Sequence, residues 1–217
     1  RDVLGSRGLG DVYKRQTMHN YADALKDAEA ALASTSSVPY SSAAVSKPTF
    51  IDIEDASWMW GILITDKDRV STTGICNFPS HMGSLNYGYA SVGGWRRISP
   101  KLYNQIPESD VRKGWFLDDT GVSVNLPAAA QAYITKKGAP VYTQVKYGPM
   151  NDEWGSNNNA TDVILMRVEE MYLIKAEAQA MNNDVSGGVN TLNSFVNTYR
   201  DPSYKCTATT CLLYTSP

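Results

Sequence analysis

"RVEEMYLIKAEAQA", Arg167–Ala180, is the stretch that decides the fold. It lacks Gly and Pro and consists mostly of strong helix formers, so it predicts a helix. Steps of three and four residues place Arg167, Glu170 and Glu177 on one face, and apolar side chains cover most of the remainder. A helix that is apolar nearly all round is expected to be buried, and buried charges must be paired or hydrogen-bonded. We therefore interpret these charges as architectural, with no catalytic role.

The partners of these charges follow from the same spacing. Arg167 and Glu170 are expected to pair within the helix. Glu177 needs a partner from elsewhere, such as a free backbone N–H at the end of another helix. Asp162–Met181 is predicted as the longest helical segment, ended by "NNDVSGG", and "VNTLNSFVNTY", residues 189–199, predicts a second helix. The two form a helical hairpin that tertiary packing must stabilise.

Both ends of the chain have the sequence of translated sequencing adapter. "SRGLGDVYKRQ", residues 6–16, back-translates to the transposase mosaic end of tagmentation libraries, and "CLLYTSP", residues 211–217, fits the complementary strand. We interpret residues 1–16 and 211–217 as adapter and leave them out of the fold prediction. Residues 17–210 are then expected to be a fragment of one domain, truncated at both ends.

Composition excludes some functions. The chain carries 20 basic and 22 acidic residues, for a net charge of −2, which becomes −4 without the adapter stretches. This mildly acidic composition lacks the excess of positive charge that is typical of nucleic-acid-binding proteins. No apolar run approaches the roughly 20 residues that a membrane span requires. Outside the adapter only Cys76 and Cys206 remain, which form no zinc motif, and a disulfide between them stays open.

The rest of the chain predicts one more helical region and a long irregular centre. Residues 18–34 form an amphipathic helix whose alanines allow a second helix to approach closely. Residues 41–159 are rich in Gly, Pro, Ser, Asn and aromatics, with short runs at 58–65 and 139–147 that predict strands or buried turns. Short helices are expected within 99–116, with Ser99 as a cap. The predicted fold class is mainly α, with helical hairpins carrying long loops and a few short strands.

"MRVEEMYLIKAEAQAMNND", followed by "VNTLNSFVNTYR", resembles the C-terminal signature of the SusD/RagB family. The matching positions are Arg167, Glu170, Ala176, Glu177, Ala178, Leu192, Asn193 and Arg200. "DASWMWGILITD", residues 55–66, and "YADALKDAEAALAS", residues 21–34, are similar to further segments of that family in the same order. The portion from Arg167 to Arg200 is the specific part of the resemblance.

The resemblance implies a tetratricopeptide-like, SusD-like fold and a role in nutrient uptake. Members of the family are surface-exposed outer-membrane lipoproteins of Bacteroidetes that bind polysaccharides, oligosaccharides or other nutrients. They deliver these ligands to a SusC-like TonB-dependent transporter, and they need no cofactor. The lipid-bearing Cys of the family is absent from this fragment, so outer-membrane attachment is implied by the resemblance alone. Function is then expected in the loops that the helices carry.

"SHMGSLNYGYASVGGW", residues 80–95, is the loop most typical of a carbohydrate platform. Glycine and small residues separate its rings, and a sugar can lie on an aromatic face while its hydroxyls bond to polar side chains. Trp154 lies in a polar loop and is a further surface candidate, whereas Trp58, Trp60 and Trp115 are expected in the core. The candidate ligand-binding residues are Asn86, Tyr87, Tyr89, Trp95, Arg96 and Trp154.

Two other function classes stay open. Asp66 with Asp68, and Asp118 with Asp119, are carboxylate pairs of the kind a glycoside hydrolase needs, but in Gly-rich turns such residues are more typical of solvated turns. The isolated His19 and His81 support neither a metal site nor a Ser-His system. The second alternative is a helical scaffold or adhesion protein that binds another protein, which predicts buried rings in residues 87–95 and an apolar patch on the helices.

Overall fold

The computed structural model describes residues 3–72 and 77–209, which form two compact units. The helical unit contains the chain up to Pro39, Ala56–Trp60, and the chain from Met166 onward, whereas the loop unit contains Tyr40–Asp55 and Gly61–Leu165. The open question of a bridge between Cys76 and Cys206 lies outside the described residues, as does the adapter-like stretch 211–217.

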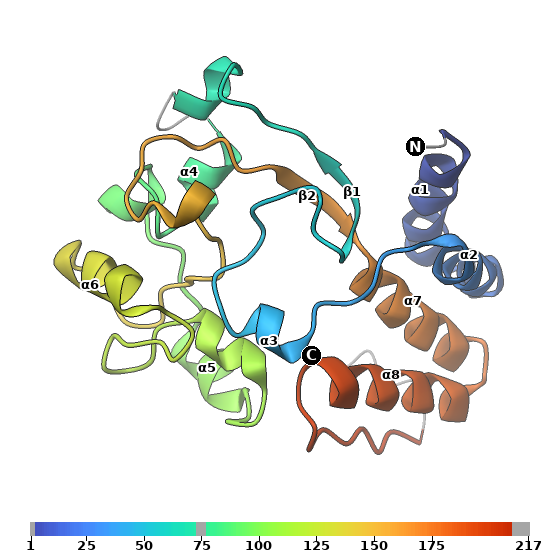
Figure 1. Cartoon of the computed structure of the whole chain (residues 1–217). Coiled ribbons are helices and arrows are strands. Elements are labelled where there is room, and N and C mark those ends of the chain that lie inside the picture. Colours follow the sequence, from blue (N-terminus) through green and yellow to red (C-terminus); the bar gives the residue numbers. More distant parts are fainter. Residues whose placement is uncertain (1–2, 73–76, 210–217) are drawn as a thin grey trace. The chain divides into compact units, whose positions relative to one another are not determined.

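The helical unit is built around one central helix. The helices of this unit are α1 (Val3–Thr17), α2 (Tyr21–Ser34), the central helix α7 (Val168–Met181) and α8 (Val185–Tyr199). Helix α7 packs against α2 on one side and α8 on another, and α1 packs on α2 (Figure 1). Ala24 and Ala28 of α2 are fully buried, so the prediction that small residues allow close helix packing is confirmed. Met171 and Ile174 of α7 complete this core.

The start of α7 differs from the prediction. Residues 163–167 form strand β2 (Val163–Arg167), which pairs with β1 (Trp58–Ile62) in a two-stranded sheet, and the helix begins only at Val168. The predicted helix over Asp162–Arg167 is therefore wrong. The β-branched Val163 and Ile164 favour an extended backbone, and strand β1 satisfies the hydrogen bonds that a helix would have satisfied internally.

The start of α8 also differs. "NNDVSGG" was expected to separate the two helices, but α8 already begins at Val185, within that stretch. Asp184 is its N-cap, and the Asp184 carboxylate accepts the Gly187 N–H at 2.9 Å. Gly188 is buried against α7, where a Cβ would lie 2.6 Å from the Ala176 carbonyl oxygen. The glycines thus serve helix packing at this position, and the helical hairpin itself is confirmed.

A buried ion pair joins α7 to the end of α8. Glu169 and Arg200 are only 2% and 3% exposed, and Arg200 Nη2 donates to Glu169 Oε1 at 3.0 Å. Arg167 Nη1 lies 3.6 Å from the same oxygen. The Arg200 guanidinium also lies 5.6 Å from the centroid of the Phe195 ring. Glu169, which the sequence analysis did not single out, is thus the carboxylate on which two signature arginines converge.

The predicted partners of Glu170 and Glu177 need correction. The Arg167 backbone N–H donates to Glu170 Oε1 at 3.2 Å, which is one half of a capping box, while the Arg167 guanidinium approaches Glu169. Glu177 accepts a hydrogen bond from the Gln16 side-chain amide, where a backbone N–H was expected. The Tyr13 hydroxyl donates to Glu170. Both of these partners belong to α1, in the segment that the sequence assigns to adapter.

The loop unit consists of short helical turns linked by extended chain. Its elements are α3 (Ser42–Val45), η1 (Arg69–Thr72), α4 (Phe78–Met82), η2 (Ala90–Val92), α5 (Pro100–Gln105), η3 (Val111–Trp115), α6 (Ala128–Lys136) and η4 (Met150–Asp152). Ser99 caps α5 as predicted, because its hydroxyl accepts the Leu102 N–H at 3.2 Å. The predicted strand in the run at 58–65 is confirmed as β1, which covers Trp58–Ile62.

Residues 139–147 form a turn at 140–143 and continue as extended chain to Tyr147. Their backbone forms isolated bridges on several sides, pairing Thr143 with Arg97, Gln144 with Phe116, and Tyr147 with Thr49. These bridges satisfy backbone groups without a regular sheet, which a buried extended segment requires. The prediction of a strand or buried turn here is therefore confirmed in the form of a turn followed by bridged, extended residues 143–147.

An aromatic cluster surrounds the end of this segment. The Lys146 ammonium lies 5.9 Å from the Phe50 and Trp115 ring centroids and 5.1 Å from that of Tyr147. Phe50 also contacts Tyr40 edge-on, with the centroids 5.6 Å apart. The Phe50 backbone has φ +61°, a left-handed conformation that is strained for an aromatic residue. Its ring contacts therefore act against an unfavourable torsion.

The three tryptophans assigned to the core behave differently. Trp58 and Trp115 are buried, as predicted. Trp60 is 52% exposed, so its assignment to the core is wrong. Period-two alternation places Trp58 and Trp60 on the same face of β1, but other residues cover that face only at its start.

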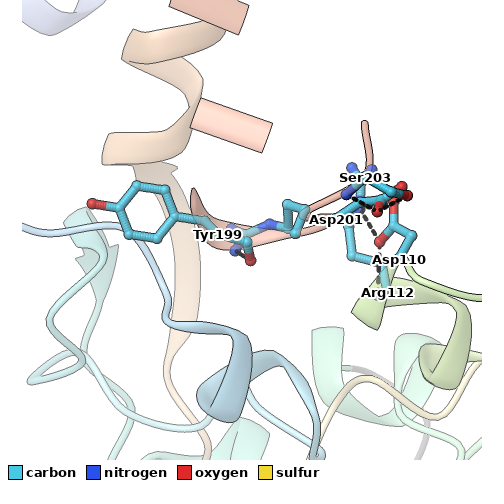
Figure 2. A network of polar contacts seen from close by, with 6 residues as sticks. Asp110, Arg112, Tyr199, Asp201 and Ser203 are labelled. Carbon is cyan, nitrogen blue, oxygen red and sulfur yellow. Dashed lines mark hydrogen bonds and ion pairs between the residues drawn. The ribbon is translucent and has the colours of Figure 1, made fainter. Parts of the chain in front are cut away.

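Buried carboxylates fix loop segments and element ends. Asp162 accepts the backbone N–H of Ile53 and of Ile64, each at 2.7 Å, and so connects two segments of the loop unit. In the same unit, Asp110 begins η3 and accepts both the N–H and the guanidinium Nε of Arg112, at 2.9 and 3.0 Å (Figure 2). In the helical unit, Asp201 accepts the N–H and the hydroxyl of Ser203 directly after α8 (Figure 2).

The buried pair yields a stability prediction. Arg200→Met leaves the buried Glu169 carboxylate without its 3.0 Å partner, so we expect it to lower the free energy of unfolding by about 3 kcal/mol or more. The matched control is Lys175→Met, which removes the more exposed pair with Glu29 and should cost less than about 1 kcal/mol. Urea denaturation of both variants measures the difference. Equal losses in the two variants would contradict the assigned role of Glu169.

Candidate functional site

Two loops that are distant in sequence meet in the loop unit. The Gly155 N–H donates to the Leu85 carbonyl and the Tyr87 N–H to the Ser156 carbonyl, both at 2.8 Å. The Asn86 side-chain amide donates to the side-chain oxygen of Asn159. The structure thus brings the loop that carries Tyr87 next to the loop that carries Trp154, as a shared ligand site requires.

Asn86 itself does not face the solvent. It is buried, its side-chain amide binds Asn159, and its backbone carbonyl accepts the Tyr133 hydroxyl at 3.3 Å. Asn86 is therefore not the hydrogen-bond partner for a sugar that the sequence predicts. Its role is to hold the two loops together, and we remove it from the ligand-contacting set.

Tyr87 and Tyr89 present their rings at the surface, with 44% and 49% of each residue exposed. Gly88 between them is buried, and a Cβ there would lie 2.5 Å from the Ser80 Cα. Only glycine allows the loop to approach α4 this closely. The prediction that glycine spacing leaves ring faces accessible therefore agrees with the structure for Tyr87 and Tyr89, where the scaffold alternative predicts buried rings, but not for the half-buried Trp95.

A third ring, which the sequence analysis missed, belongs to this surface. The exposed imidazole of His81, on α4, stacks on Tyr89 with the centroids 5.3 Å apart and an interplanar angle of 29°. A Cβ at Gly94 would lie 2.7 Å from Tyr89 Cδ1, so the backbone of Gly94 lies against the same ring. Tyr89 is therefore held in place by neighbours, and His81 covers part of one of its faces. The sequence carries little signal for this role, because the stacking of His81 on Tyr89 depends on tertiary structure.

Trp95 and Trp154 mainly anchor their loops. Both are half-buried against the apolar core of the loop unit. That core consists of Leu85, Leu117, Ala130, Ile134 and Val145. Trp154, which the sequence predicts at the surface, is thus half-buried against this core.

Arg96 is half-buried, and Gly94 connects it to Tyr89. Its Nη1 donates to the Gly94 carbonyl at 2.7 Å, and Gly94 in turn donates its N–H to the Tyr89 carbonyl at 3.1 Å. The neighbouring Arg97 is exposed and donates through Nε to the Val141 carbonyl at 2.9 Å. One residue, Gly94, thus separates the Arg96 guanidinium from the Tyr89 ring.

The carboxylate pairs considered for hydrolysis form turns. Asp68 accepts the N–H and hydroxyl of Thr65, which lowers the pKa of its carboxyl. Burial acts to raise the pKa of Asp118, but the N–H groups of Val122, Thr120 and Gly121 and the Thr120 hydroxyl outweigh it, so this pKa lies below its usual value. The expectation that these aspartates serve as turn residues is confirmed. Among the described residues, no group of three or more His, Cys, Asp or Glu side chains is arranged to hold a metal ion.

Solved structures resemble this chain. A SusD-like carbohydrate-binding protein from Bacteroides vulgatus matches with a TM-score of 0.62 and 22% identity over 95% of this chain and 38% of the other. A SusD superfamily protein from Bacteroides thetaiotaomicron matches with a TM-score of 0.67 and 17% identity, over 92% of this chain and 41% of the other. A SusD superfamily protein from Parabacteroides distasonis matches with a TM-score of 0.57 and 13% identity, over 89% of this chain and 41% of the other.

The chain has the SusD-like fold. The likeness extends over nearly all of the chain, which spans about two fifths of the length of the proteins it matches. The resemblance of the Arg167–Arg200 signature to the SusD/RagB family is thereby confirmed for the fold, as is the mainly α class. Comparisons with protein-family models and with curated proteins found no match. No helix in the described part of the chain combines the length and apolarity needed to cross a membrane.

The amide bridge between the two loops yields a prediction on local opening. Asn159→Ala removes the partner of the buried Asn86 amide, so we expect the Tyr87 amide proton to exchange about tenfold faster. Asn157→Ala is the matched control, because that side chain is exposed and only its backbone carbonyl contacts Asn159. Hydrogen exchange resolved to residues 83–89 provides the measurement. An unchanged rate in Asn159→Ala would mean that the backbone bonds alone hold the loop.

The Asp118 turn yields a pH prediction. Because the pKa of Asp118 is lower in the folded state, its contribution to stability is present above the unfolded-state value, near 4, and is lost as the pH falls through the folded-state value. We expect Asp118→Asn to be less stable than the parent at pH 7 and to approach the stability of the parent as the pH falls through the folded-state pKa of Asp118. Thermal unfolding across pH 2–7 measures this, and a pH-independent difference would contradict the assignment.

Proposed function

We propose that this protein binds glycans as a non-catalytic accessory to nutrient uptake. The observation that carries the proposal is the platform formed by the exposed residues Tyr87 and Tyr89 of the loop and His81 of α4, where hydrogen bonds and half-buried tryptophans hold the loop in place. A sugar presents a face of C–H groups that packs on such rings, and polar groups at their edges bind its hydroxyls. A rigid platform loses little conformational entropy when it binds.

The similarity to a protein described as SusD-like and carbohydrate-binding supports the same ligand class. Under this proposal the protein lies on the outer-membrane surface through a lipid anchor that precedes the present sequence. It hands captured polysaccharide or oligosaccharide to a SusC-like TonB-dependent transporter. The uninterrupted reading frame tests the location directly, because a signal peptide that ends at a lipid-accepting Cys is expected upstream.

Affinity electrophoresis against a panel of polysaccharides tests glycan binding. We expect retardation of the parent protein by at least one polysaccharide and about two- to tenfold weaker binding in Tyr87→Ala and in His81→Ala, because each removes one ring contact. His81→Phe keeps a ring that can stack and should retain most of the affinity. Trp60→Ala is the matched control, since it removes an exposed ring that is not part of the platform.

The outcomes separate the alternatives. Equal loss in Trp60→Ala and Tyr87→Ala, or no retardation by any glycan, would overturn the proposed platform. Release of reducing sugar by purified protein would instead support the hydrolase alternative, for which two carboxylates must act across the bound chain.

A further inference from the structure

Arg96 has a binding capacity that the protein does not use. A guanidinium carries five N–H donors in a planar fork, and here one of them donates to the Gly94 carbonyl. Within the described ranges, no Asp or Glu lies within ion-pair distance of Arg96, and no other hydrogen bond of its side chain is formed. A half-buried cation has lost part of its hydration, so an anionic partner stabilises it strongly.

The position of this guanidinium relates it to the ring platform. Gly94 binds Arg96 through its carbonyl and Tyr89 through its N–H, and its Cα packs against the Tyr89 ring. The guanidinium and Tyr89 are thus both in contact with Gly94. An acidic substituent on a sugar bound at Tyr89 could pair with this guanidinium, whose geometry matches a carboxylate or sulfate.

The geometry points to acidic glycans as the ligand class of this site, with Arg96 as the residue that binds the uronate carboxylate or sulfate group. The inference rests on the proposed function and specifies its substrate. The chain as a whole carries a net negative charge, so general electrostatic attraction does not favour an acidic polymer. Selectivity for the anion must therefore come from a local contact.

Arg97 provides a matched control next to Arg96. It lies in an extended segment paired with Thr143, and successive side chains of an extended segment point to opposite faces. Arg96→Gln and Arg97→Gln change the net charge equally, so any long-range effect of charge is the same in both variants. Glutamine also keeps an N–H donor for the carbonyl oxygen that each arginine contacts.

The experiment uses two pairs of polymers matched in backbone. Polygalacturonate is compared with highly methyl-esterified galacturonan, and carboxymethyl cellulose with hydroxyethyl cellulose, by affinity electrophoresis of the full chain. We expect the parent to prefer the acidic member of at least one pair. Arg96→Gln should weaken binding to that member about tenfold and abolish the preference, whereas Arg97→Gln should retain it. Thermal unfolding verifies that both variants are folded.

Each result supports or overturns a specific statement. Binding of neutral members with no acidic preference, lost in Tyr87→Ala, would overturn the acidic-glycan inference and leave the proposed function intact. Equal effects of Arg96→Gln and Arg97→Gln would remove Arg96 from the site. Absence of binding to both pairs and to the wider polysaccharide panel would overturn the proposed function and this inference together.

Discussion

The helical unit depends on a carboxylate that water does not reach. Glu169 lies near the start of α7, and Arg200 reaches it from the end of α8, so the ion pair determines how the two helices meet. An apolar interface alone permits several registers, whereas a buried charge tolerates only the arrangement that supplies its partner. Tyr172, Phe195 and Tyr199 pack as a series of rings at the same interface, and the Arg200 guanidinium lies over the middle ring.

The loop unit solves a different problem. It has little regular secondary structure, so its buried backbone groups need individual partners. Isolated bridges along residues 143–147, the Asp162 carboxylate and the Asn159 side-chain amide supply them. Polar residues that look like ligand contacts in the sequence are therefore used for internal support. Tyr87, Tyr89 and His81 remain exposed, and the half-buried Arg96 contacts Gly94 next to the Tyr89 ring.

Local signals in the sequence predicted the elements that depend on local contacts. The alanines of α2, the Ser99 cap and the Gly88 spacing all act within a few residues of their own positions. Features that depend on distant partners were missed. Strand β2 reads as helix until β1 pairs with it, and Glu169 is recognised as buried only once Arg200, 31 residues later, is in place. Asn86 was assigned to a ligand because its partner lies 73 residues away, and the role of His81 was missed because stacking on Tyr89 leaves no pattern in a sequence.

Phe50 illustrates how little freedom such a loop fold leaves to sequence drift. Its left-handed torsion would suit glycine or asparagine, but either replacement deletes the ring that Tyr40, Trp115 and Tyr147 surround. Isoleucine or valine would keep an apolar side chain, but the left-handed torsion is still less favourable for a β-branched residue. None of these replacements therefore both keeps the ring contacts and relieves the torsion at position 50.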